Sequence, residues 1–457
     1  MSTPLRTAFA ALLALCPLAA QIPSGHAAVA WKPSNPTATG GIKLVDRAGV
    51  VRDLTGLSAA TLGTTRFDGG QSVAVSSIGE LFVGLGVDNR TGTTPLPLEV
   101  RRILVSGTTA ILDQPLATVH TVPAGELWKV SDLQVRGDGS LLVAATEILA
   151  NANPMPKTLA CLVLPGGTVV NLAAVSQFPA GSLVAVADLG TRFAAAFLQS
   201  FFVVNLEVMS FTYDSVPAGF RVHQFVSVPR MAALGADANG ELLLAGQLPT
   251  PAGQSSLVRL PHAPGATPVA VTGGPTAVAV ADFVAPAAVA AVFTPPTLIA
   301  GSLQLVDMLA GQGSMWAQTV VRDPVDIALR QSPAHYGLAS GNGPGLAWLG
   351  TDGGLPAVGN GLFGLRVGGT TGSQGVILAS IGRGNVPTPF GTILLDLSVM
   401  AQVAGYTVPN TGALRLGLPL PNNPSLIGQA VTFQALAIAS ASPLLAECSR
   451  GLELVFF

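Results

Sequence analysis

A short apolar phrase interrupted by a tight turn recurs six times between residues 73 and 340. In each copy a few apolar residues precede the turn and more apolar residues follow it. A unit of this size cannot bury its apolar face alone, so it must stack on copies of itself. The repeat therefore predicts an all-β fold, with a β-propeller as its architecture. The six copies begin at Val73, Leu133, Val184, Leu234, Val278 and Ile327.

The spacing of the turns is that of propeller blades, which need about 40 to 50 residues for four strands. The turn positions are Gly79, Gly139, Gly190, Gly240, Val284 and Pro333. A second series of hairpin phrases alternates with the first, at residues 99–114, 159–173, 257–271 and 303–320. Two hairpins per period give the four strands of a blade. We predict six blades, with seven as the alternative. Further hairpin phrases lie at 41–54 and 345–358, and we expect one of them to complete a closing blade built from both ends of the chain.

The composition indicates many short strands and argues against a nucleic-acid-binding protein and against a transmembrane helix. The 457 residues include 53 Gly and 35 Pro, and only 10% of them are charged. The net charge of −2 and the aromatic content of 5% argue against a nucleic-acid partner. The apolar run at residues 283–293 contains Pro286 and is too short for a membrane-spanning helix. We therefore expect neither nucleic-acid binding nor a transmembrane helix.

The N-terminus has the layout of a secretory signal peptide. Arg6 precedes an apolar stretch at residues 8–20, which ends in small residues. We predict a signal peptide within residues 1–30, cleaved after Ala20 or, alternatively, after Ala27 or Ala30. This pattern predicts a secreted, periplasmic or cell-surface protein. Removal of the segment leaves Cys161 and Cys448, which either form a disulfide or are two small buried thiols.

The rhythm of the repeat ends near residue 358. We therefore expect a propeller over residues 40–358 and a second all-β domain over 359–457, built as a sandwich or jelly roll. Three stretches of the second domain, which begin at Gly359, Leu418 and Cys448, resemble a C-terminal module of uncharacterised secreted bacterial proteins. This resemblance implies a β module on an exported protein and carries over no site. The first domain resembles six-bladed propellers of the NHL or TolB-like kind in layout only.

Residues that could carry chemistry are scattered. His120, His223, His262 and His335 lack metal-ligand spacing, and there is no Cys-x-x-Cys motif. Asp237 and Asn239 belong to a segment that fits a hairpin turn better than a calcium loop. The sequence therefore assigns no catalytic, cofactor-binding or metal-ligating residue and predicts no cofactor.

Four aspartates lie in or beside the repeated phrases, at Asp132, Asp188, Asp282 and Asp326. Asp188 and Asp282 end two identical Val-Ala-Val-Ala-Asp segments. In a propeller channel the four carboxylates could bind a cation or polarise a substrate. The alternative is that they hydrogen-bond to the backbone of turns.

These observations favour a secreted or cell-surface binding or structural protein without enzymatic activity. Its partner would be an unknown protein or glycan at the cell surface. One alternative is a propeller hydrolase or lactonase with channel carboxylates and a divalent metal, for which the four aspartates should converge on one channel mouth. A further alternative is an outer-membrane β-barrel, suggested by the terminal Phe456-Phe457, although the chain has only 3 Tyr and 4 Trp for aromatic girdles.

Overall fold

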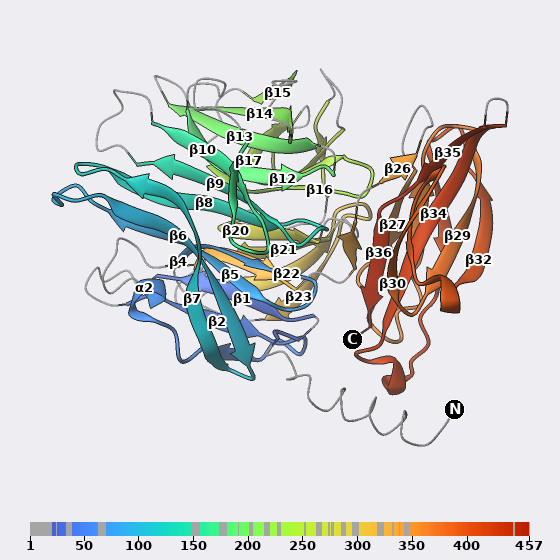
Figure 1. The fold of residues 1–457 in the computed structure, drawn as a ribbon, viewed down its shortest axis with the longest axis horizontal. Coiled ribbons are helices and arrows are strands. Elements are labelled where there is room, and N and C mark those ends of the chain that lie inside the picture. The colour runs from blue at the N-terminus through green and yellow to red at the C-terminus, as the bar shows by residue number, and fades with distance from the viewer. Residues whose placement is uncertain are drawn as a thin grey trace.

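Short antiparallel strands make up nearly all the regular structure of this computed structural model (Figure 1). Among the described residues, helical turns are limited to α2 (Ala59–Leu62), η3 (Leu397–Val399) and η4 (Pro424–Leu426). The all-β class predicted from the repeat is confirmed. The structure describes residues 21–23, 25–32, 39–62, 70–148, 156–172, 181–190, 192–200, 204–213, 220–225, 230–250, 253–261, 267–272, 275, 278–284, 289–294, 301–317, 324–330, 333–337, 339–341, 347–441 and 444–456.

Five groups of four antiparallel strands follow one another along the chain. The first two are β4 (Gly70–Val75), β5 (Leu81–Asp88), β6 (Leu96–Ser106) and β7 (Thr109–Val122), then β8 (Leu127–Val135), β9 (Leu141–Glu147), β10 (Thr158–Val163) and β11 (Val169–Asn171). The third is β12 (Ser182–Asp188), β13 (Arg192–Ser200), β14 (Val204–Thr212) and β15 (Phe220–Phe225). The fourth is β16 (Arg230–Ala236), β17 (Leu242–Thr250), β18 (Gly253–Leu260) and β19 (Val269–Ala270), and the fifth is β20 (Val280–Val284), β21 (Val289–Thr294), β22 (Ser302–Asp307) and β23 (Gln312–Ala317). The end of β5 also pairs with β8, which joins the first two groups into one sheet.

A further four-stranded sheet combines both ends of this region. Its innermost strand is β24 (Pro324–Leu329), which pairs with β1 (Ala27–Trp31). β2 (Gly41–Val45) and β3 (Val51–Asp53) follow, so the hairpin phrase at 41–54 takes the closing position. The sixth copy of the repeated phrase was expected to form a hairpin around Pro333, and this expectation is wrong. Its first half pairs with the N-terminal strand, because closing the ring requires a partner from the start of the chain.

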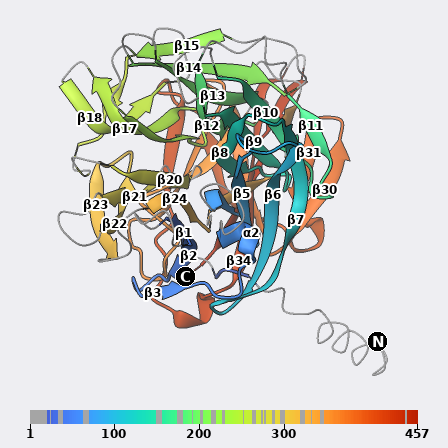
Figure 2. The same cartoon turned by 90° about the vertical axis from the view of Figure 1, so that its left-hand side faces the viewer.

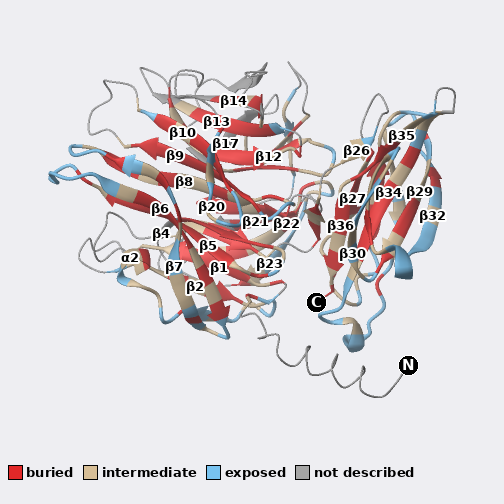
Figure 3. Ribbon diagram, viewed as in Figure 1, coloured by how far each residue is buried: buried red, intermediate tan, exposed pale blue. Residues whose placement is uncertain are grey.

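The first strands of these sheets lie side by side in a closed ring, with each of β4, β8, β12, β16, β20 and β24 next to the following one and β24 next to β4. Figure 2 looks onto this arrangement, in which the sheets succeed one another around a common centre. Side chains buried between neighbouring sheets form the core (Figure 3), and Trp128, Phe193 and Phe283 are among the largest. The predicted propeller is confirmed as the fold class of this region.

Neighbouring sheets approach closely because small residues face larger ones. A Cβ atom added to Gly84 of β5 would lie 2.4 Å from Val130 Cγ1 of β8. A Cβ atom added to Gly235 of β16 would lie 2.7 Å from the Phe283 side chain of β20. No real Cβ atom tolerates such contacts, so glycine sets the distance between these pairs of sheets.

The C-terminal part of the chain forms a separate set of sheets. The larger sheet contains β25 (Ala334–Tyr336), β36 (Gly451–Val455), β34 (Ala430–Ala441), β29 (Gln374–Ser380) and β32 (Ala401–Thr407) in that order, with β35 (Leu444–Cys448) beside β34 and β26 (Ser340–Gly341) beside β35. The smaller sheet is β27 (Trp348–Asp352), β28 (Gly364–Gly368) and β33 (Ala413–Gly417), and β30 (Arg383–Thr388) pairs with β31 (Gly391–Leu395). One apolar core contains buried side chains of the larger and the smaller sheet, including Leu365 of the smaller sheet and Ile377 and Phe433 of the larger one. Strands within residues 334–352 belong to these sheets, so the pairing crosses residue 358, the domain boundary predicted from the sequence.

Both described cysteines are buried free thiols, Cys161 in β10 and Cys448 in β35. The buried-thiol alternative therefore describes them, and they form no disulfide. In the part of the chain that the structure describes, no helix is long and apolar enough to span a membrane.

Candidate functional site

Three of the four predicted aspartates meet at the centre of the propeller. Asp132 of β8, Asp282 of β20 and Asp326 of β24 line a polar cavity of about 100 Å³ together with Lys129. They come from innermost strands, which is why their side chains converge there.

Each of these carboxylates connects two neighbouring sheets. One oxygen of Asp132 accepts from the N–H of Leu133 and the other from Val186 of β12, both at 2.8 Å. The other two repeat this arrangement: Asp282 accepts from Phe283 and Leu329, and Asp326 from Ile327, Val73 and the Ser72 hydroxyl, at 2.7 to 2.8 Å. Both oxygens of each group are thus engaged by backbone amides.

The ionisable groups of the cavity have perturbed pKa values because they are buried. Burial raises the pKa of Asp282 to about 7 and that of Asp326 to about 6, and it raises the pKa of Asp132 as well. The negative charge of Asp326 adds to the shifts of the other two carboxyls. Burial also lowers the pKa of Lys129, against the attraction of Asp326. At neutral pH the cluster therefore carries less negative charge than its composition suggests.

Asp188 does not join this cluster, so the convergence of all four aspartates is wrong. Although Asp188 and Asp282 end identical segments, Asp188 pairs with Phe193 at the very end of its hairpin. Asp282 pairs with Ala291, two residues before the last pair of its hairpin. This shift places Asp188 at the end of β12, outside the channel.

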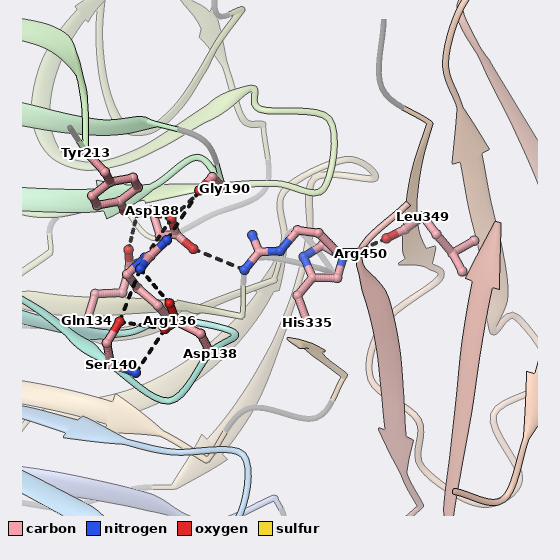
Figure 4. Close-up of polar contacts among 10 residues, drawn as sticks. All are labelled: Gln134, Arg136, Asp138, Ser140, Asp188, Gly190, Tyr213, His335, Leu349 and Arg450. Carbon is pink, nitrogen blue, oxygen red and sulfur yellow. Dashed lines mark hydrogen bonds and ion pairs between the residues drawn. The ribbon is translucent and has the colours of Figure 1, made fainter. Parts of the chain in front are cut away.

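Asp188 instead lines a second cavity, of about 200 Å³, where the propeller meets the C-terminal sheets (Figure 4). Turns of three successive inner hairpins contribute Arg136, Asp188 and the segment 236–240. The C-terminal side contributes Trp348 and Arg450. We call this cavity the interdomain pocket.

The Asp188 carboxylate is the centre of the hydrogen bonding in the interdomain pocket. Its Oδ2 accepts from Arg450 Nη2 at 3.1 Å, and its Oδ1 accepts from the Tyr213 hydroxyl at 2.7 Å and from Arg136 Nε at 3.4 Å. Oδ1 also accepts from the N–H of Gly190, which closes the hairpin turn. Burial alone would raise the pKa of Asp188, but Arg450 and Arg136 outweigh burial and hold it below its usual value. The carboxylate is therefore ionised and shared between two guanidinium groups.

Arg136 is also paired within the interdomain pocket. Arg136 donates to Asp138 at 2.7 Å and to Ser140 at 3.2 Å, and its guanidinium lies 4.0 Å from the centre of the Tyr213 ring. The Asp188 N–H donates to the side chain of Gln134. The pocket therefore presents polar groups without a large excess of either charge.

His335 lies at the wall of the interdomain pocket as a neutral imidazole. Its Nε2 is 2.7 Å from the Leu349 carbonyl oxygen, which can only accept, so Nε2 carries the proton. Burial, together with the positive charge of Arg450, lowers the pKa of His335 to about 3. Among the described histidines, His335 is the one that lines the interdomain pocket.

The other predicted polar residues lie elsewhere or form turns. His120 packs against Trp128, with 4.3 Å between the ring centroids. The side chain of His223 and all of His262 lie outside the described residues. Asp237 Oδ1 accepts from the N–H groups of Asn239 and Glu241, which is the expected hairpin turn, and burial raises its pKa to about 6. Among the described residues, no group of three or more His, Cys, Asp or Glu side chains could hold a metal ion.

Sequence reasoning missed Arg136, Tyr213 and Arg450. A signal for Arg136 existed, because it stands beside the turn glycines of its phrase, as Asp188 does in the next phrase. Arg450 lies in a turn of the other domain, and nothing in the local sequence relates it to Asp188.

No family model and no curated protein matches this chain. Solved structures with a similar fold include TolB from Acinetobacter baumannii, with 12% identity, 66% of each chain covered and a TM-score of 0.42. A puromycin hydrolase has 12% identity and a TM-score of 0.40, over 77% of this chain and 52% of that one. The chain thus spans about two thirds of the TolB chain and half of the hydrolase chain. A putative 6-phosphogluconolactonase from Bacteroides uniformis ATCC 8492 has 9% identity and a TM-score of 0.36, over 66% of this chain and 98% of that one.

Proposed function

We propose that this chain is an exported binding protein without enzymatic activity, and that its ligand occupies the interdomain pocket. In this proposal the strands from β1 to β24 supply a six-bladed propeller and the strands from β25 to β36 an accessory β domain. The observation that carries the proposal is the internal neutralisation of Asp188 by Arg136 and Arg450 in a cavity built from both parts. A site in which the Asp188 carboxylate is already shared by two guanidinium groups favours a ligand that is polar and uncharged.

The size and lining of the pocket suggest one sugar unit. A volume of about 200 Å³ lies below the range of about 300 to 1,000 Å³ of drug-sized sites. The exposed turn residue Asn239 offers an amide, and Trp348 offers an apolar ring edge or face. A pyranose ring combines hydroxyl groups for the amide with C–H faces for the indole. The ligand would then be a neutral saccharide, free or at the end of a cell-surface glycan.

Titration calorimetry of the mature protein with neutral mono- and disaccharides tests this proposal. We expect saturable binding that Asn239→Ala and Trp348→Phe weaken about tenfold, the loss of about one good hydrogen bond or contact. Asn385→Ala is the matched control, because Asn385 is an exposed residue of β30 that does not line the pocket. Absence of binding across the saccharide panel, or binding that none of these variants changes, would overturn the proposal.

A hydrolase or lactonase is the second candidate, because Asp282 and Lys129 have pKa values shifted toward neutrality. We rank it below binding since backbone amides occupy both oxygens of each channel carboxylate. Assays with ester and lactone substrates test it. Turnover that Asp282→Asn abolishes and Asn239→Ala leaves intact would support the channel and reject the interdomain pocket as the functional site.

A further inference from the structure

The β30–β31 hairpin covers part of the outer face of the larger C-terminal sheet. The inner face of this sheet packs against the smaller sheet, in the core that contains Phe433 and Ala435. Side chains alternate along a strand, so Gln434 points to the outer face. Its Oε1 accepts from the Leu394 N–H and its Nε2 donates to the Thr392 carbonyl, both at 2.9 Å. These bonds fix the hairpin against the outer face.

The outer face beside the hairpin is apolar. Two rows of directly paired residues cross strands β29, β34 and β35 there. The rows are Val376, Leu436 and Cys448, and Gln374, Ile438 and Ala446. The outward-facing residues of a sheet packed on another sheet are normally polar. All of these residues except Gln374 are apolar, so the rows depart from that pattern.

The two rows form the floor of a preformed groove of about 740 Å³. Phe390 of the hairpin turn and Leu444 of β35 also line it. Phe390, Ile438 and Leu444 are 43%, 51% and 41% exposed, so the groove presents apolar area to water that a ligand would cover. The hairpin lies close to the floor, because a Cβ atom added to Gly391 would lie 2.7 Å from Cys448 Sγ.

The strands beneath the groove favour a small apolar ligand over a peptide. β29 pairs with β32 and β34, β34 pairs with β29 and β35, and β35 pairs with β34 and β26. An extended peptide in the groove would therefore bury backbone N–H and C=O groups without partners from the floor. A helix is about 10 to 12 Å across, so fewer than about two turns would fill this volume, and so short a helix is not stable in water. A hydrocarbon chain has no polar groups to satisfy, and the volume lies within the range of about 300 to 1,000 Å³ of small-molecule sites.

We infer that the groove binds the hydrocarbon chain of a neutral single-chain amphiphile, such as a long-chain alcohol or a monoacylglycerol. The described lining contains no Lys or Arg that would pair with an anionic head group. Glu447 is its acidic residue, but the Glu447 Oε1 already accepts from the Thr370 hydroxyl at 2.9 Å, and strand alternation turns this side chain away from the floor. The exposed Gln374 offers an amide to a hydroxyl head group. A flat bilayer does not fit a concave groove, so the ligand is a free molecule.

Titration calorimetry of the mature protein with straight-chain alcohols from hexanol to decanol, below their solubility limits, tests the inference. The affinity should rise about fourfold for each added methylene, which is the gain from burying one CH₂ group. Ile438→Glu should weaken decanol binding about tenfold or more, because it places a charge against the chain. Ile381→Glu is the matched control, since Ile381 is 74% exposed and does not line the groove. Circular dichroism establishes that both variants fold.

A space-filling variant tests the groove without adding charge. Ala446→Phe should weaken the binding of decanol more than that of hexanol, because it shortens the space for the chain. In crystals grown with bromine-labelled decanol, the anomalous signal of bromine should lie between β34 and the hairpin.

Three results would overturn the inference: no saturable binding of any alcohol, an affinity independent of chain length, or equal weakening by Ile438→Glu and Ile381→Glu. Binding to phosphatidylcholine vesicles without binding of free alcohols would assign the surface to a membrane instead. A dimer that Ile438→Glu dissociates, without alcohol binding, would assign it to a second copy of the chain. Saccharide binding is measured with other ligands and other variants, so failure of one proposal leaves the other standing.

Discussion

Arg450 Nη2 lies 3.1 Å from Asp188 Oδ2, and this ion pair connects a turn of the C-terminal domain to the end of strand β12 in the propeller. The Asp188 side chain is only 8% exposed. A carboxylate buried to this extent is stable only while its partners remain, because removing one partner leaves an uncompensated charge. The contact therefore couples the position of the C-terminal domain to the polar network of the propeller.

Replacing Arg450 with Ala should lower the free energy of unfolding by about 3 kcal/mol, since Asp188 then keeps only Arg136 as a charged partner. Urea denaturation followed by circular dichroism measures this change. Arg415→Ala removes the more exposed pair with Asp352 and should cost less than about 1 kcal/mol. Equal losses of unfolding free energy in the two variants would show that the buried Asp188–Arg450 pair stabilises the protein no more than the exposed Asp352–Arg415 pair does.

The contribution of Asp282 and Asp326 to stability should fall as the pH rises from about 4 to 7. Asp282 and Asp326 have folded pKa values of about 7 and 6, above the usual 3.8, so the folded state holds protons that the unfolded state has released in this range. Their contribution is complete below pH 4 and is lost as the pH passes 6 to 7. Asp188, whose pKa is lowered, acts in the opposite sense at more acidic pH, and His335, whose pKa is lowered to about 3, does so over the same range as Asp282 and Asp326.

Thermal unfolding at a series of pH values checks this window. Compared with the parent, Asp282→Asn should make the slope of stability against pH more positive between about pH 4 and 7, because the asparagine does not titrate. Asp53→Asn, which alters an exposed carboxylate of β3, should leave the slope unchanged. A slope that Asp282→Asn leaves unchanged would contradict the raised pKa of Asp282.

The mature protein should begin at Gln21. Residues 1–20 lie outside the described residues, but Ile22 is buried, and its N–H donates to the Gly79 carbonyl at 2.8 Å. Strand β1 also uses Ala27 and Ala30 between β2 and β24. Cleavage after Ala20 leaves these contacts intact, whereas cleavage after Ala27 or Ala30 removes part or most of β1. N-terminal sequencing of the exported protein decides among the three sites, and a start at Ala28 or Trp31 would be inconsistent with this sheet.

Gly84→Ala should destabilise the protein by about 1 to 3 kcal/mol, because the new methyl group would overlap Val130 of the next sheet. Gly166→Ala is the control, since the added Cβ meets nothing within 4 Å. This control should stay within about 0.5 kcal/mol of the parent. Chemical denaturation of both variants tests whether glycine sets the spacing between these sheets.

The two described cysteines should be unreactive in the folded protein and fully reactive after unfolding. Burial raises the pKa of Cys161 to about 12 and also raises that of Cys448, so little thiolate forms at neutral pH. Titration with a thiol reagent should detect neither thiol in the native mature protein and both in denaturant without reductant. Absence of thiols after denaturation would instead indicate a disulfide.

The inner hairpins could be predicted from sequence because their signal is local. Gly79, Gly139, Gly190 and Gly240 all have φ between 81° and 86°, a conformation that glycine adopts without strain. The repeated turn residues thus report directly on backbone geometry. The hairpin predicted around Pro333 failed because the partner of β24 lies at the other end of the chain, and no local pattern records that.

The candidate site was harder to predict than the fold. The four residues before Asp188 and before Asp282 are identical, but the two aspartates differ by two residues in their position along the hairpin. The Asp188 side chain therefore lies at the domain boundary and the Asp282 side chain lies in the channel. The match between Asp188 and Arg450 depends on how two domains dock. The way two domains dock depends on the shapes of their whole surfaces, so the contact between Asp188 and Arg450 cannot be predicted from the local sequence around either residue.

The pairing of Ala27 with Leu329 has a consequence for how the chain folds during synthesis. Strand β1 leaves the ribosome first, yet its inner neighbour is made only after the intervening sheets. The ring therefore cannot close during most of synthesis, and the edge of β1 that pairs with β24 stays unpaired until β24 is made. Closure then becomes a late step that joins distant parts of the chain, which slows folding. Such a delay is compatible with the export proposed above, because the ring can be completed only once nearly the whole propeller sequence has been made.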